Sequence, residues 1–146
     1  MIPKRVVLDT NVCLDLFVFR DPRWAVLAAA LHSGGIDAVT RADCRMEWLM
    51  VLRYPHLPLD DDARERAAAE FDARIRCLDA AELQADTGIR LPLCSDPDDQ
   101  KFLETALAAK ASTLITKDKA LLKLARKTER AGLFRIQLPQ QWRLEE

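Results

Sequence analysis

Acidic side chains that could hold a metal ion occur at four separate places in the sequence, each beside an apolar run that is typical of a strand or a helix. They are Asp9, Glu47, the group Asp96, Asp98 and Asp99, and Asp118. Grouped carboxylates repel one another, so without a cation some of them would have to take up protons. Oxygen ligands with few histidines or thiolates select Mg²⁺ or Mn²⁺ over Zn²⁺. If the four places meet in space, they predict a divalent-metal site.

The apolar runs predict strands that alternate with helices along all 146 residues. Strands are expected at residues 5–8, 36–40, 112–116 and 133–138. Helices are expected after Asp9, over 22–31, from a Thr40 cap to "YPHLP", over 59–78, from Asp98 to about Leu107, and over 117–128. This alternation predicts one domain over residues 1–146, a three-layer α/β/α sandwich around a mostly parallel central sheet.

A parallel sheet would bring the four acidic places together. Asp9 follows the first strand and Asp118 follows the strand at 112–116, so both are expected at the carboxyl edge of the sheet. The helix that begins at Asp98 must run back antiparallel to its strand, which places its N-terminus at the same edge. Glu47 comes early enough in its helix to reach back toward them.

Some of these acids also have a structural interpretation. Asp96 before Pro97 matches a helix N-cap followed by proline at the first helical position. Asp9 could cap the turn into "TNVCL", and Asp118 could be a first-turn acid with Thr116 as the cap. Glu47 lies among large hydrophobic residues in "MEWLMVL", where an unpaired carboxylate is costly, and this favours a functional role.

The ordered set of motifs resembles a PIN domain over nearly the whole chain. The matching stretches are "VVLDTNV", "MEWLMVLRYP", "DPDDQKFLETALAAKASTLITKD" and "FRIQLPQQW". Within that family the sequence is most similar to the group described as toxin components of bacterial toxin-antitoxin systems.

The resemblance implies a Mg²⁺- or Mn²⁺-dependent endoribonuclease, a homodimer and an antitoxin protein as partner. It makes Asp9, Glu47, Asp99 and Asp118 the catalytic, metal-binding acids, with Asp96 as an additional acid of the metal site. Asp99 is preferred to Asp98 because it precedes "QKFLETALA" as the family's third acid does. Thr10, Asn11 and Thr116 correspond to polar residues that support the site.

Charge is unevenly distributed along a chain whose net charge is only -1. Acids dominate residues 60–99 and bases dominate 101–135, and an acidic centre beside a basic stripe can bind metal and then phosphate. The lysines expected to contact the RNA backbone are Lys101, Lys117, Lys119 and Lys123, although each could also belong to a solvated helix face. No apolar run suits a membrane span or signal peptide, so a cytoplasmic protein is expected. The cysteines, Cys13, Cys44, Cys77 and Cys94, show no C-x-x-C spacing and are predicted to be buried thiols.

Two other functions remain open from the sequence. An Asp after a first strand is also the nucleophile of phosphatases that form an aspartyl-phosphate. Such phosphatases generally have a second Asp two residues further on, where this chain has Asn11. A non-cleaving module that binds protein or RNA is the other alternative, with "WLMVLRYPHLP" as a groove for a partner protein.

Overall fold

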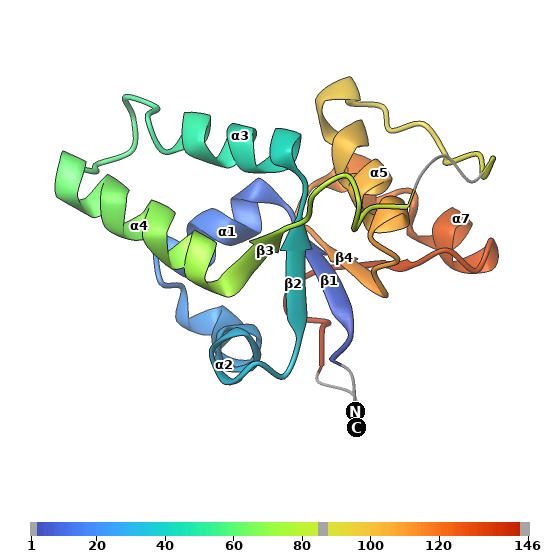
Figure 1. The fold of residues 1–146 in the computed structure, drawn as a ribbon, viewed down its shortest axis with the longest axis horizontal. Helices are drawn as coiled ribbons and strands as arrows, with labels where there is room; N and C mark the ends of the chain where they lie inside the picture. Colours follow the sequence, from blue (N-terminus) through green and yellow to red (C-terminus); the bar gives the residue numbers. More distant parts are fainter. Residues whose placement is uncertain (1–2, 85–87, 144–146) are drawn as a thin grey trace.

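A computed structural model describes residues 3–84 and 88–143. Within these ranges five strands form one parallel sheet in the order β3-β2-β1-β4-β5 (Figure 1). The strands are β1 (Arg5–Leu8), β2 (Asp37–Thr40), β3 (Ile75–Cys77), β4 (Thr113–Ile115) and β5 (Arg135–Gln137). The first strand is therefore central, with β2 on one side and β4 on the other.

Helices cover both faces of the sheet (Figure 1). One layer contains α1 (Thr10–Phe17), the 3-10 turn η1 (Pro22–Trp24), α2 (Ala25–Ser33), α3 (Ala42–Val51) and α4 (Asp61–Arg74). The other contains η2 (Pro97–Asp99), α5 (Gln100–Ala108), α6 (Lys119–Leu122) and α7 (Ala125–Arg130). The predicted α/β/α sandwich with a parallel central sheet is confirmed.

The central strand shows why the chain folds into three layers. Val6 and Leu8 belong to the core beneath α1 to α4, whereas Val7 belongs to the core beneath α5 to α7. Successive side chains of a strand point to opposite faces, and a strand buried on both faces is apolar throughout. In the first core, the rings of Trp48 and Phe71 stack with centroids 5.2 Å apart, which joins α3 to α4.

The strand β3 was not predicted, because residues 59–78 were expected to form one helix. The helix α4 ends at Arg74, and Ile75 turns into an extended conformation and is buried. Arg76 and Cys77 are exposed, so this edge strand of three residues lacks the apolar run that identified the others. The prediction that all four cysteines are buried is correct for Cys13, Cys44 and Cys94 and wrong for Cys77.

Two further details differ from expectation. Thr40 is the last residue of β2, and Arg41 occupies the N-cap position of α3, so Thr40 does not cap that helix. The basic segment 117–128 forms two short helices, α6 and α7, with a break at Lys123 and Leu124. None of the helices in the described ranges is both long enough and apolar enough to cross a bilayer.

Candidate metal centre

The parallel sheet places two of the predicted acids at one edge. β1 and β4 pair in register, with Leu8 opposite Ile115, and the backbone N–H of Asp9 donates to the carbonyl of Ile115 over 3.0 Å. Asp9 follows β1 directly, and Asp118 follows β4 after only Thr116 and Lys117. Both acids therefore leave the carboxyl ends of neighbouring strands.

Thr116 connects these two acids. Its hydroxyl donates to Asp9 Oδ2 over 2.6 Å and accepts a hydrogen bond from the backbone N–H of Asp118 at 2.9 Å. Asp118 is itself the N-cap of α6, accepting from the N–H of Ala120 at 2.8 Å, so Thr116 does not fill the predicted capping role. Asp9 occupies the N-cap position of α1, but its side chain makes no capping bond within the described structure. Its carboxylate is thus directed to the site rather than to the helix.

A third segment brings two more acids to Asp118. Asp96 is the N-cap of η2 and accepts from the N–H of Asp98 at 3.0 Å, as the Asp-Pro pattern predicted. One carboxylate oxygen from each of Asp96, Asp99 and Asp118 lies within 4.8 Å of the others. Asp98 is exposed, whereas only 9% of the surface of Asp99 is accessible. Of the two adjacent acids, Asp99 is the one that faces the group.

The carboxylate of Asp99 fits a bound cation. Its Oδ2 is fully buried and has no hydrogen-bond partner among the residues that the structure describes. A buried polar atom without a partner costs about 1 to 3 kcal/mol, and more when it is charged. Three carboxylates without thiolate or imidazole neighbours in the group suit a hard cation such as Mg²⁺ or Mn²⁺.

Burial and mutual repulsion change the protonation of the central acids. Burial raises the pKa of Asp9 from 3.8 to about 6, against the hydrogen bond from Thr116, and the charges of Glu47 and Asp118 raise it further. Burial also raises the pKa of Asp99 to about 8, and the neighbouring carboxylate of Asp118 is the next cause. Without a cation, the carboxyl of Asp99 therefore keeps its proton near neutral pH.

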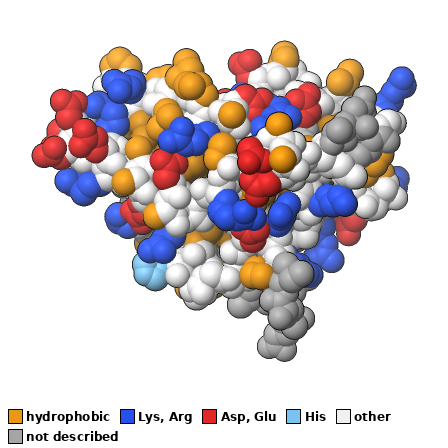
Figure 2. All heavy atoms as spheres, viewed as in Figure 1, with side chains coloured by type: hydrophobic (Ala, Val, Ile, Leu, Met, Phe, Trp, Pro, Cys, Tyr) orange, Lys and Arg blue, Asp and Glu red, His pale blue; other side chains and the backbone are white. Residues whose placement is uncertain are grey.

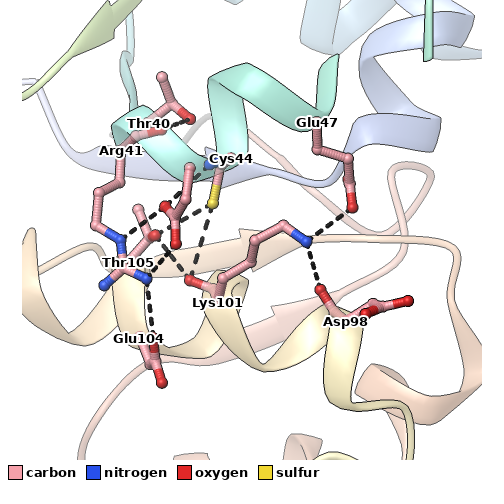
Figure 3. Close-up of polar contacts among 9 residues, drawn as sticks. Thr40, Arg41, Cys44, Glu47, Asp98, Lys101, Glu104 and Thr105 are labelled. Atoms are coloured by element: carbon pink, nitrogen blue, oxygen red, sulfur yellow. Dashed lines mark hydrogen bonds and ion pairs between the residues drawn. The ribbon is translucent and has the colours of Figure 1, made fainter. Parts of the chain in front are cut away.

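Glu47 reaches the edge of the sheet from α3 but has its own partners. Its Oε1 lies 2.8 Å from Lys101 Nζ, and its Oε2 accepts a short hydrogen bond from the hydroxyl of Thr10 (Figure 3 shows the Lys101 contact). Among the described residues, Glu47 and Asp9 lie outside the group formed by Asp96, Asp99 and Asp118. The charge of Glu47 nevertheless raises the pKa of Asp9, and Glu47 is hydrogen-bonded to Thr10, the residue that follows Asp9. The costly unpaired carboxylate inferred from the sequence is therefore paired.

The predicted lysines fall into two kinds. Lys101 and Lys117 form ion pairs, with Lys117 Nζ 2.5 Å from Asp15 Oδ2. Lys119 at the start of α6 and Lys123 at its end are exposed, as is Asn11 in α1. On the face drawn in Figure 2, basic and acidic side chains are intermixed, and they do not form one continuous basic surface.

Two polar groups near the site were not identified from the sequence. Asp15 is buried and accepts from the indole N–H of Trp24 at 2.9 Å as well as pairing with Lys117. Its isolated charge inside the apolar run "VCLDLFVF" is a signal that could have been used. The second group is centred on Arg41, which pairs with Asp43 of α3 and with Glu104 of α5; Figure 3 shows the contact with Glu104. The sequence gives no sign that these helices meet.

Comparison with known proteins agrees with this geometry. A family model described as PIN domain matches residues 5–120, a range that includes every acid discussed above. No match was found among curated proteins. The matched range extends from the first strand to the start of α6 and so covers most of the chain. On this evidence, the chain belongs to the PIN-domain family.

Proposed function

We propose that this protein is a metal-dependent ribonuclease that hydrolyses RNA phosphodiester bonds with Mg²⁺ or Mn²⁺. PIN domains are in general nucleases, and the acids of the proposed site are Asp9, Glu47, Asp99 and Asp118, with Asp96 at its rim. The single observation that supports this most strongly is the buried oxygen of Asp99, which lacks a partner in the described structure although two other carboxylates lie beside it.

Each element of the site has a separate task in this proposal. A bound divalent ion supplies activation of a water molecule and stabilisation of the charge that develops on the leaving oxygen. Asp99, whose pKa burial raises to about 8, must release its proton before it binds the ion. Thr116 fixes the orientation of Asp9 through its hydroxyl. No side chain of the protein is required as the nucleophile.

The substrate and partners follow from the same proposal. The exposed Lys119 begins the helix α6 after Asp118 and the exposed Lys123 follows its last residue, so both can contact the phosphates that flank the scissile bond. Lys117 and Lys101 can contact RNA only by leaving their carboxylate partners. We further propose that the protein acts in the cytoplasm as the toxin of a toxin-antitoxin pair and that it forms a homodimer.

A cleavage assay that compares variants at the adjacent residues Asp98 and Asp99 tests the enzymatic activity. Labelled single-stranded RNA is incubated with Mn²⁺ and the wild type, Asp99→Asn or Asp98→Asn. We expect Asp99→Asn to lower the rate by at least about 100-fold, whereas Asp98→Asn, a change in an exposed neighbour, stays within a few-fold. Cleavage by Asp99→Asn at the wild-type rate would refute the proposed site. Hydrolysis of p-nitrophenyl phosphate, with intact RNA, would indicate a phosphatase instead.

The biological role is tested in growing bacteria. Induced expression of the wild type should arrest growth, because RNA cleavage stops protein synthesis, and expression of Asp99→Asn at the same level should not. Growth arrest by both proteins would mean that toxicity does not require RNA cleavage, and it would favour the non-cleaving binding module. Equilibrium ultracentrifugation of the purified chain measures the proposed homodimer.

A further inference from the structure

Lys101 is held in a fixed position beside the proposed site. Its Nζ lies 2.8 Å from Glu47 Oε1 of α3 and donates to the backbone carbonyl of Asp98 at 2.5 Å (Figure 3). The ammonium also lies 5.4 Å from the ring centroid of Phe102, and only 20% of the side chain is exposed. Contacts with residues of α3, η2 and α5 thus keep one positive charge at the acidic edge of the sheet.

The acids at this edge differ in how far their oxygens are satisfied. Both oxygens of Glu47 have donors, Lys101 on one side and Thr10 on the other. By contrast, a buried oxygen of Asp99 has no donor among the described residues, and Asp96 and Asp118 lie beside it. One part of the site therefore presents a buried carboxylate oxygen without a donor, and the other part already contains a cation supplied by the chain.

We infer that the protein binds a single divalent ion, in the group formed by Asp96, Asp99 and Asp118, and that the Lys101 ammonium replaces a second ion at Glu47. This inference rests on the proposed function and specifies how its site is filled. Two-metal nuclease sites place their ions about 3.5 to 4 Å apart. A lysine at ion-pair distance from Glu47 neutralises the carboxylate that would attract the second ion, and it repels that ion directly.

The number of bound ions tests the inference without an activity assay. Mn²⁺ binding is measured by titration calorimetry and by the electron paramagnetic resonance signal of free Mn²⁺. We expect one ion per wild-type chain, and two per chain of Lys101→Met, which retains an apolar stem over Phe102 but removes the charge. The second ion should appear in Lys101→Met at a Mn²⁺ concentration at least about tenfold lower than any that yields a second ion in the wild type. Lys127→Met, a change in an exposed lysine of α7, should still bind one ion.

The possible outcomes separate this inference from the proposed function. Two ions in the wild type would overturn the inference while leaving the metal-dependent nuclease in place, and this count requires no variant. A single ion in folded Lys101→Met would also overturn it. Adding Glu47→Gln to Lys101→Met should return the count to one, because it removes the carboxylate that binds the second ion. No ion in the wild type would refute the proposed metal site and this inference with it.

Discussion

The hydroxyl of Thr116 donates a 2.6 Å hydrogen bond to Asp9 Oδ2, and the two residues are 107 positions apart in the sequence. The bond exists because β1 and β4 are parallel neighbours whose carboxyl ends coincide. It also holds a carboxylate whose pKa burial raises to about 6. The orientation of this acid therefore depends on the pairing of the strands at the centre of the sheet.

The stability of the metal-free protein should fall as pH rises. The pKa of Asp99 is about 8 in the folded protein and near 3.8 when unfolded, so the folded state binds the proton more tightly. This contribution is fully present below about pH 4 and is lost as pH rises through about 8; for Asp9 the loss is complete near pH 6. Urea unfolding in EDTA at pH 5 and pH 8 measures the difference in the free energy of unfolding.

Asp99→Asn supplies the comparison for this pH effect. The variant cannot ionise at this position, so we expect its stability to fall less between pH 5 and pH 8 than that of the wild type, by about 2 to 4 kcal/mol. Asp62→Asn, in the exposed first turn of α4, should keep the wild-type slope. Equal slopes for all three proteins would mean that the carboxyl of Asp99 is not protonated in the fold.

Mn²⁺ should raise the melting temperature of the wild type. An ion that binds only the folded state at 100 times its Kd adds about 2.7 kcal/mol, which corresponds to a rise of about 5 to 10 °C for a domain of this size. Differential scanning calorimetry at pH 7.5 over a range of Mn²⁺ concentrations measures it. Asp99→Asn should show a much smaller rise, since it loses the buried ligand. An unchanged melting temperature of the wild type at millimolar Mn²⁺ would contradict the metal site.

Removing Asp15 should weaken both the fold and metal binding. Asp15→Ala leaves the indole N–H of Trp24 and the ammonium of Lys117 without their buried acceptor, at a cost of about 2 to 4 kcal/mol. Because Lys117 lies between Thr116 and Asp118, we also expect Mn²⁺ affinity to fall by roughly tenfold. Urea unfolding and calorimetric titration measure the two effects. The exposed Glu65→Ala should change stability by less than about 0.5 kcal/mol and leave affinity unaltered.

In the aromatic stack between α3 and α4, removing the ring of Phe71 should lower stability strongly, whereas exchanging the ring of Trp48 for a smaller ring should lower it little. Phe71→Ala removes a buried ring and is expected to cost about 3 to 5 kcal/mol. Trp48→Phe should cost less than about 1.5 kcal/mol, because the buried Nε1 of Trp48 has no hydrogen-bond partner in the described ranges. Denaturant unfolding of both variants provides the comparison. A larger loss for Trp48→Phe would indicate that the indole nitrogen does have a partner.

Much of the fold could be predicted because the central strands are apolar on both faces. The apolar segments "RVVL" and "TLI" are typical of buried strands. Because the carboxyl ends of parallel strands lie at one edge of the sheet, Asp9 and Asp118 are then expected near each other. The strand β3 could not be found this way, because an edge strand needs only one buried side chain, Ile75, to hold its place. Its remaining residues resemble the helix that precedes them.

The pairing of charged side chains was less predictable than their location. Asp99 could be chosen over Asp98 by resemblance, and burial of Asp99 distinguishes the two in the structure. The contact between Lys101 and Glu47 depends on how closely α5 approaches α3, a distance that neither segment encodes locally. The sequence therefore does not show whether a lysine next to an acidic site forms an ion pair or is free to bind a ligand.

The strand order has a consequence during synthesis of the chain. Asp9 and Glu47 leave the ribosome early, whereas Asp99 and Asp118 emerge late, and β4 must pair with β1 before Asp118 reaches the same edge as Asp9. A nascent chain that ends before β4 cannot assemble the acidic edge. Any activity that depends on this edge can therefore begin only late in translation.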